Sequence, residues 1–204
     1  MKRKALFLSL AILFVIISVI FQDIFSFYLK CRSIRENTIR LHVIANSDSE
    51  QDQTLKLAVR DAILDAFGDI DTSVSKNDAE KIISGKLSDI ISVAETVISE
   101  QGFDYPVRAE LTETYFDTKE YDNFTMPSGN YDALRIIIGT GNGKNWWCVM
   151  FPPLCIPAAY QKNSININEY YGNSSEILVR KTKYKVKFAI VELCEKIVRK
   201  LKSS

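Results

Sequence analysis

The sequence has little of the residue types on which metal centres and many catalytic sites depend. Its 204 residues include one histidine and four cysteines. Structural zinc sites need Cys or His in closely spaced pairs, and the four cysteines are scattered, so the sequence predicts no metal site. Catalysis that needs an imidazole would have to use His42, beside which no nucleophile elbow or oxyanion glycine occurs. We also expect no cofactor.

Nucleotide-binding and nucleic-acid-binding motifs are also missing. Residues 139–144 read Gly-Thr-Gly-Asn-Gly-Lys, but they lack the spacing of a phosphate-binding loop and do not lead into a helix. The local pattern favours a hairpin turn between two strands. No nucleic-acid-binding module accompanies the basic C-terminal region. We therefore expect neither a nucleic acid nor a small-molecule substrate as a partner.

The net charge of +1 conceals two oppositely charged regions. Residues 48–122 hold 18 acidic and 7 basic side chains, whereas residues 180–204 hold 9 basic and 2 acidic ones. Both regions can be ordinary solvated surfaces. The alternative for the basic region is contact with anionic lipid headgroups, which attract clustered lysine and arginine.

The N-terminus contains the one long apolar run. Lys2, Arg3 and Lys4 precede 17 residues, 5–21, which are at the short end of what a membrane-spanning helix needs. No small-x-small cleavage site follows, which favours an uncleaved signal anchor over a cleaved signal peptide. The early basic residues predict a cytoplasmic N-terminus and an exported remainder. We assign residues 1–30 to this helix and the polar residues 31–38 to a tether.

Residues 39–204 have the length and apolar content of one domain. Alternating side chains predict a first strand over residues 39–45. Apolar residues at helical spacing, with Gly68 and Gly102 as stops, predict two helices next. The remaining expected elements are strands within residues 105–116, 134–138 and 145–150, and a last helix over residues 184–202. The predicted fold is α+β, in the order β-α-α-β-β-β-α, with a mainly antiparallel sheet packed by helices.

The segment between the first strand and the first helix has more polar residues than folding requires. Ser49 fits a helix N-cap, and Asp52 lies in the first turn, where the helix dipole favours an anion. The remaining polar residues of the segment have weaker local roles, and they are His42, Asn46, Asp48 and Gln53. We therefore expect function in this segment.

Two interpretations of His42 stay open. It is either a strand residue used in packing or in a protein contact, or the base of an exported hydrolase. The first is favoured, because no assembled catalytic motif accompanies the histidine. The hydrolase would use Ser47, Ser49 or Cys148 as nucleophile and Asp48 or Asp52 as orienting acid.

Aromatic residues and cysteines gather near residue 150. Trp146 and Trp147 are adjacent, so in a strand they face opposite sides, and the outward one is a candidate contact residue unless a helix covers both. Cys148 and Cys155 flank two prolines and suit a disulfide, which would add about 2–3 kcal/mol of stability; free buried cysteines are the alternative. Cys194 lies among apolar residues, and we expect it in the core.

Two motifs together resemble a known family. The first is Arg40-Leu-His-Val-Ile-Ala-Asn-Ser-Asp-Ser49, followed by Asp52-Gln53 and Val59-Arg60-Asp61. The second is Asn145-Trp-Trp-Cys-Val-Met-Phe-Pro-Pro-Leu-Cys155. In content and separation they are similar to the signatures of the stage II sporulation protein R family, and the resemblance extends to the last helix.

The resemblance implies an intercellular signal made during endospore formation. Members of this family are exported from the forespore into the intermembrane space, where a membrane aspartic protease of the mother cell senses them and matures a sigma-factor precursor. This chain would activate the protease without catalysing a reaction itself. The competing classes are the exported hydrolase and a structural envelope protein. The residues expected to contact the partner are His42, Asn46, Asp48, Asp52, Gln53 and Trp146.

Overall fold

A computed structural model of the chain describes residues 2–68, 70–71, 73–121, 124–154, 167–179 and 181–202. The chain forms two compact units. The chain leaves the second unit after Phe116 and returns to it at Asn130, and the single domain expected over residues 39–204 stays a prediction. The first unit consists of Met1–Ile34, Asp117–Gly129 and Tyr171–Ser204, and the second of Arg35–Phe116 and Asn130–Tyr170.

The second unit is built on a four-stranded sheet with the strand order β2-β5-β1-β6. β1 is parallel to β5 and antiparallel to β6. Side-chain contacts of Asn130 with Glu113 and of Arg135 with Glu110 run in opposite order along β5 and β2, as in an antiparallel pair. The predicted mainly antiparallel sheet is thus confirmed. Its strands are β1 (Ile39–Ile44), β2 (Val107–Phe116), β5 (Gly129–Ile138) and β6 (Asn145–Phe151).

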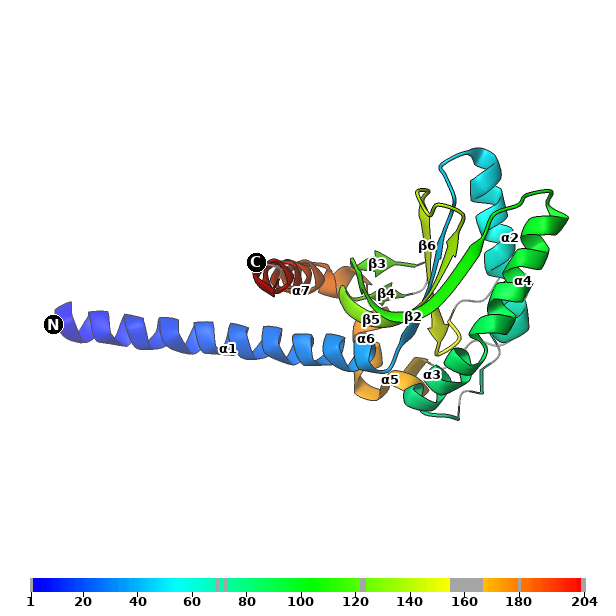
Figure 1. Cartoon of the computed structure of the whole chain (residues 1–204). Coiled ribbons are helices and arrows are strands. Elements are labelled where there is room, and N and C mark those ends of the chain that lie inside the picture. Colours follow the sequence, from blue (N-terminus) through cyan, green and yellow to red (C-terminus); the bar gives the residue numbers. More distant parts are fainter. Residues whose placement is uncertain are drawn as a thin grey trace. The chain divides into compact units, whose positions relative to one another are not determined.

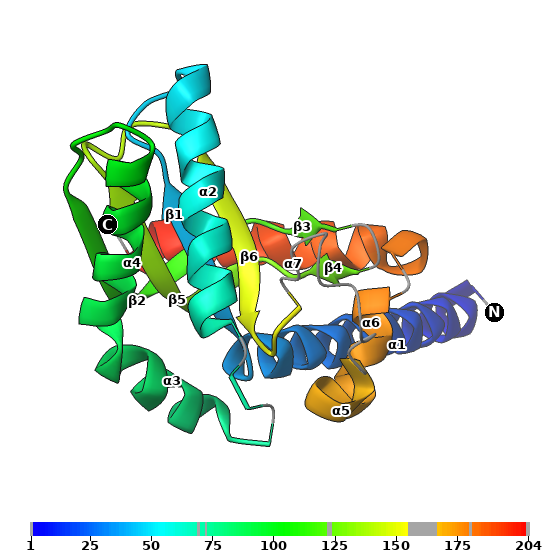
Figure 2. The same cartoon turned by 90° about the vertical axis from the view of Figure 1, so that its right-hand side faces the viewer.

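Three helices pack on this sheet: α2 (Glu50–Phe67), α3 (Lys76–Gly85) and α4 (Leu87–Glu100). Figure 2 shows α2 and α4 lying across the same face of the sheet. Burial of each large aliphatic side chain contributes about 1.5–3 kcal/mol, so the shared apolar core holds the helices in place. Its central members are Leu41, Val43, Leu55, Val59, Ile63, Ile90, Ala94, Ile98, Leu134 and Ile136.

Two local features of this unit differ from the prediction. The expected long second helix is divided, because α3 ends at Gly85 and Lys86 has φ −109° and ψ 9° before α4 begins. Glycine is a weak helix former, so the chain bends there at little cost. Residues 139–143 do not form a hairpin, because β1 lies between β5 and β6. They cross the end of β1 instead, where the backbone N of Gly143 donates to the carbonyl of Ala45 at 2.9 Å.

The predicted N-terminal helix is present as α1 (Lys2–Glu36). Arg3–Glu36 is long and apolar enough to span a membrane by length and composition, and its most apolar window is unburied. Residues 31–38 were expected to be a tether, but α1 continues through Glu36 and buries Cys31 and Ile34. These two residues follow Phe27 at helical spacing, and this apolar stripe extends the helix.

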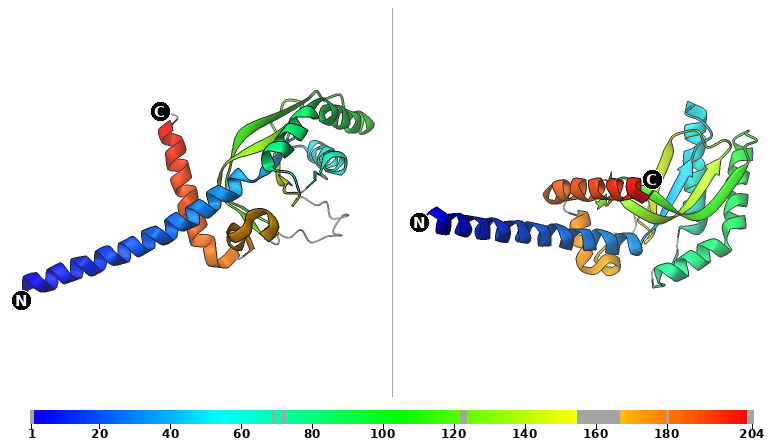
Figure 3. Two further views of the ribbon diagram at one scale, coloured as in Figure 1. Left: turned by 90° about the horizontal axis from the view of Figure 1, so that it is seen from below. Right: turned by 60° about the vertical axis from the view of Figure 1, so that its left-hand side comes forward.

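The rest of the first unit lies beside α1. Phe27 packs on Tyr184 and Phe188 of α7, with ring centroids 5.5 and 5.0 Å apart. Figure 1 shows α7 above α1, and the left view of Figure 3 shows α7 crossing α1. Helix α7 confirms the predicted last helix. Cys194 is exposed rather than in the core, because α7 buries its other side. The remaining elements of this unit are β3 (Lys119–Glu120), β4 (Thr125–Met126), η2 (Gly172–Ser174), α6 (Ser175–Val179) and α7 (Lys181–Lys202). The short helix α5 (Ile167–Tyr171) belongs to the second unit except for its last residue.

Candidate partner-binding site

The turn after β1 is organised around the N-terminus of α2. Ser49 is the N-cap, and its Oγ accepts a hydrogen bond from the backbone N of Asp52 at 3.1 Å. Asp52 is only 4% exposed. Its Oδ2 accepts hydrogen bonds from Asn46 Nδ2 at 3.0 Å and from Ser47 Oγ at 2.5 Å. One buried carboxylate therefore joins the end of the strand to the start of the helix.

These hydrogen bonds determine the charge state of Asp52. Burial by itself raises the pKa of Asp52, but hydrogen bonds from Ser47, Asn46, Tyr105 and Ser49 outweigh it and lower the pKa below its ordinary value. The pKa of Tyr105 is raised, first by burial and then by the charge of Asp52. At neutral pH a carboxylate thus accepts hydrogen bonds from a protonated phenol and its other neighbours.

The glycine-rich loop after β5 closes over Asn46. The side-chain Oδ1 of Asn46 accepts a hydrogen bond from the backbone N of Thr140 at 3.0 Å. The backbone carbonyl of Asn46 accepts another from the backbone N of Asn142 at 3.1 Å. Gly139 has a φ of 58°, and a Cβ at this position would lie 2.3 Å from Asn46 Oδ1. Glycine alone has both the conformation and the space that this approach requires. The position of the loop therefore depends on the side chain of Asn46, and the position of Asn46 depends on the loop.

A second set of contacts fixes Asp48 and Gln53. Asp48 Oδ1 accepts a hydrogen bond from the backbone N of Lys144 at 2.7 Å. Gln53 Nε2 donates to the carbonyl of Ser47 at 2.8 Å, while its Oε1 accepts from Lys56 Nζ at 2.7 Å. Lys56 is buried and also donates to the carbonyl of Lys144 at 3.1 Å. Burial lowers the pKa of Lys56, and the charge of Asp48 opposes this shift.

Partly exposed side chains lie beside this hydrogen-bond network. Trp146, in β6, is 37% exposed, and the guanidinium carbon of Arg60 lies 4.2 Å from its ring centroid. Arg60 also pairs with Asp61, with 2.6 Å between nitrogen and oxygen. An aromatic ring stacked with an arginine is typical of residues that dominate protein interfaces. We call this surface the Trp146 face and define it by Asp48, Arg60, Asp61 and Trp146.

His42 projects from the opposite face of the sheet. Its Nε2 and Asn145 Oδ1 are hydrogen-bonded at 3.0 Å, and its ring lies edge-on to Phe116 and Trp147. On the same face the guanidinium carbon of Arg40 lies 4.5 Å from the ring centroid of Phe116. Burial lowers the pKa of His42; Asn145 opposes the shift and nearby arginine charges add to it. The imidazole is therefore neutral at pH 7 within an aromatic cluster.

The residues of the hydrolase interpretation lie in different environments. Ser47 and Ser49 hydrogen-bond at the start of α2, whereas His42 is on the far face of the sheet. Cys148 is opposite Leu41 in the strand register and belongs to the apolar core with it, and successive residues of a strand point to opposite faces. Within the described residues, no three His, Cys, Asp or Glu side chains are grouped so that they could hold a metal ion.

Hydrogen bonds connect four of the six residues that were predicted to contact a partner. Two of them, Asp48 and Trp146, are exposed, whereas His42 and Asp52 are buried. Partner contact stays a prediction for all six residues. Cys155 lies outside the described residues, so the Cys148–Cys155 disulfide stays a prediction too. Of the six predicted residues, four belong to the hydrogen-bond network, and they are Asn46, Asp48, Asp52 and Gln53.

Four residues of the network were not predicted from the sequence, and they are Lys56, Tyr105, Thr140 and Lys144. Lys56 lies next to Leu55 on the buried side of α2. Its position beside the apolar stripe could have indicated in the sequence that this lysine is buried. Thr140 and Lys144 are 94 and 96 residues away from their partners Asn46 and Asp48. No local pattern connects segments so far apart.

Comparison with known proteins places this geometry in a family. The family model of stage II sporulation protein R matches residues 35–161, which include the network, the Trp146 face and both sequence motifs. The chain belongs to the stage II sporulation protein R family. Stage II sporulation protein R of Bacillus subtilis (strain 168) is 39% identical to it over 123 residues.

The extent of these matches is limited. The aligned residues cover 60% of this chain and 55% of the Bacillus subtilis protein, so the chain spans about half the length of this relative. The family match ends at residue 161, so it does not reach α7, to which we expected the resemblance to extend. No solved structure matches the chain.

Proposed function

We propose that this chain is an exported sporulation signal that activates a membrane aspartic protease of the mother cell. The activated protease would then mature the precursor of a mother-cell sigma factor. Membership of the stage II sporulation protein R family carries this proposal, because the matched region contains both motifs. The apolar helix α1 supports export and attachment to the membrane.

The geometry of the first motif supports an activator rather than an enzyme. The polar groups of Asn46, Ser47 and Asp52 hold the end of β1, the start of α2 and the loop after β5 together. A surface fixed in this way loses little conformational entropy on binding, which favours affinity. No contact among the described residues favours the hydrolase, since Ser47 is engaged with Asp52 and His42 with Asn145.

In this proposal the Trp146 face contacts the protease. Trp146 and Arg60 stack on one another, so the ring and the guanidinium are already ordered before binding. Asp48 and Asp61 add acidic groups at the same surface. Truncation of such an aromatic or arginine residue at the centre of an interface typically costs about 2 kcal/mol or more of binding free energy.

Binding activates the protease only if the active form binds more tightly than the inactive form. A shift from 1:99 to 99:1 in favour of the active form needs a preference of about 10⁴-fold. The contacts made by the Trp146 face must therefore be formed almost entirely with the active form of the protease and not with the inactive form. A partner that bound both forms equally would leave the precursor uncleaved.

Co-expression in a non-sporulating bacterium tests the function. The host would produce this chain, the candidate protease and the sigma-factor precursor, and precursor cleavage would be followed by immunoblot. We expect cleavage only when all three are present. Equal cleavage with and without this chain would reject the proposed activation, and so would the absence of cleavage when all three proteins are produced and exported normally.

Single substitutions in the same host test the contact surface. We expect Trp146→Ala, Arg60→Ala and Asp48→Ala to reduce the rate of cleavage by about tenfold or more, which corresponds to 1.4 kcal/mol or more of lost binding. Glu95→Ala is the matched control, because Glu95 is exposed on α4 and outside the network. Normal cleavage by all three variants at equal protein level would show that the contact lies elsewhere.

A further inference from the structure

Helix α7 has two apolar sides, and contacts within the first unit cover one of them. Tyr184, Phe188 and Val191 are buried, and Phe27 of α1 packs on the two aromatic rings. Five further large apolar residues of α7 are exposed, each by 47% or more. One exposed apolar residue is ordinary, but five along one helix indicate a contact surface. This outer face of α7 consists of Val186, Leu193, Ile197, Val198 and Leu201.

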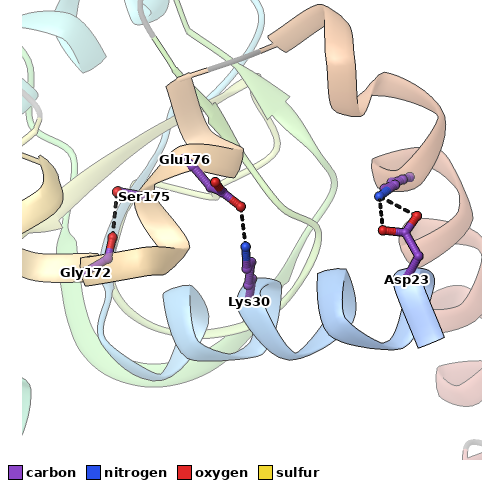
Figure 4. Close-up of polar contacts among 6 residues, drawn as sticks. Asp23, Lys30, Gly172, Ser175 and Glu176 are labelled. Atoms are coloured by element: carbon purple, nitrogen blue, oxygen red, sulfur yellow. Dashed lines mark hydrogen bonds and ion pairs between the residues drawn. The ribbon is translucent and has the colours of Figure 1, made fainter.

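Ion pairs fix the level at which α7 meets α1. Lys187 of α7 pairs with Asp23 at 2.6 Å, and Glu176 of α6 pairs with Lys30. Figure 4 shows Asp23 and Lys30 reaching from the same side of α1. Asp23 comes just after the apolar residues 5–21. Where that apolar run spans a bilayer, α7 therefore meets α1 at the level of the lipid headgroups.

The crossing of the two helices gives α7 the orientation of an interfacial helix. The left view of Figure 3 shows α7 running across α1. A helix that crosses a spanning helix at headgroup level lies in the plane of the membrane surface, as amphipathic interfacial helices do. Lys187 marks the side of α7 that reaches towards Asp23 and the apolar run. Cys194 and Leu201 follow on the same side at intervals of two helical turns.

The side of α7 away from the apolar run is polar. Glu192 Oε2 accepts a hydrogen bond from the backbone N of Thr118 at 3.3 Å, and Lys196 pairs with Asp117 at 3.0 Å. Anionic lipid headgroups attract basic side chains next to an apolar face, so the charge of α7 is complementary to a bacterial membrane surface. Lys196 is engaged by Asp117, and the other exposed basic residues of α7 include Lys183, Lys185, Arg199 and Lys200.

We propose that the outer face of α7 inserts into the headgroup region of the anionic bilayer that holds α1. The exposed apolar residues, the flanking basic charge and the crossing at the end of the apolar run all match a lipid surface. The inference requires α1 in a membrane, but it does not depend on the proposed signalling role. It also concerns a helix outside the family match. Together, α1 and α7 would attach the first unit to the bilayer at two points.

The test is a depth measurement on the full chain in vesicles of phosphatidylcholine and phosphatidylglycerol. An environment-sensitive nitrobenzoxadiazole label would be attached to the exposed thiol of Cys194. The control chain carries Cys194→Ser and Lys185→Cys, which moves the label to another exposed position. Nine residues are about two and a half helical turns, so the two labels project from opposite sides of α7.

We expect spin-labelled lipid to quench the Cys194 label at least about twofold more strongly than the Lys185→Cys label, because an interfacial helix buries its apolar side. Aqueous iodide should show the reverse order. Equal accessibility of both labels to iodide would overturn the proposal. Protection of the Cys194 label from both quenchers would overturn it as well, because protein rather than lipid would then cover the face.

Two further measurements separate lipid from a second copy of the chain. Lipid quenching of the Cys194 label should be unchanged when the protein-to-lipid ratio is lowered tenfold. If a second copy of the chain covered the label, dilution would separate the copies and the quenching would change. The double substitution Ile197→Glu and Leu201→Glu should abolish the lipid quenching. Unchanged tryptophan emission would show that the second unit, which contains Trp146 and Trp147, remains folded. Lipid quenching that survives the double substitution would contradict the proposal.

Discussion

Replacing Asp52 by Ala should unfold the second unit far more readily than the loss of one surface carboxylate would. Asp52 Oδ2 receives hydrogen bonds from Asn46 and from Ser47, and the aspartate is almost fully buried. The substitution leaves both donors without their acceptor at the junction of strand and helix. The matched control is Glu50→Ala, because Glu50 also lies in the first turn of α2 but is exposed.

The magnitude is set by the hydrogen bonds from Asn46 and Ser47, which are two of those that the Asp52 carboxylate accepts. A hydrogen bond to a charged group contributes about 1.5–3 kcal/mol, and both donors are half-buried, so water recovers part of the loss. We expect Asp52→Ala to lower the free energy of unfolding by about 2–4 kcal/mol. Glu50→Ala loses only its interaction with the helix dipole, about 0.3–1 kcal/mol.

The assay is urea unfolding of the full chain in detergent micelles, followed by tryptophan fluorescence. The sequence contains two tryptophans, Trp146 and Trp147, and both belong to the second unit, so the signal reports on that unit. A difference of less than about 0.5 kcal/mol between Asp52→Ala and Glu50→Ala would contradict this expectation, because it is smaller than the contribution of one ordinary hydrogen bond. It would mean that Asn46 and Ser47 do not depend on the carboxylate.

The remaining predictions concern pH, the loop and the exposed face. Folding lowers the pKa of Asp52, so the carboxylate contributes fully to stability above about pH 4, which is its pKa in the unfolded chain. This contribution is lost as the pH falls through the pKa of the folded state. In acid unfolding curves, Asp52→Asn should therefore make stability less dependent on pH. Gly139→Ala should cost more than Gly102→Ala in urea unfolding, by about 1 kcal/mol or more, because both glycines have positive φ but only the first faces Asn46. Trp146→Ala should lower stability by at most about 1–2 kcal/mol, since the ring is partly exposed and stacks on one arginine.

Local patterns predicted much of the fold. The alternation of Leu41 and Val43 with His42 gave the first strand and the face that packs on the helices. Ser49 was predicted as an N-cap from its position before an apolar helical stripe, and it accepts the hydrogen bond from Asp52 that defines this role. Such features depend on residues within one turn or one strand, so the sequence contains the information directly.

Pairing between distant segments could not be predicted in the same way. The position of β1 between β5 and β6 depends on which strands bury the same core, and nothing in the glycine-rich residues 139–143 distinguishes a hairpin from a crossing loop.

The candidate site was predicted in part. The polar excess after β1 indicated Asn46, Asp48 and Gln53, and all three belong to the network. The burial of Lys56 depends on the carbonyl of Lys144, and the position of His42 depends on Phe116, so neither could be inferred from neighbouring residues. The sequence pattern thus identified unusual polar residues, but it did not distinguish the buried ones from the exposed ones.

Site-specific photo-crosslinking in the co-expression host tests contact between this chain and the protease most directly. A photoreactive benzoylphenylalanine would replace Trp146 in one chain and Glu95 in another, with precursor cleavage followed in parallel. We expect a crosslink to the protease from position 146 and none from position 95, in cells where the precursor is cleaved. Cleavage accompanied by equal crosslinking from both positions, or by a crosslink from position 95 alone, would contradict it.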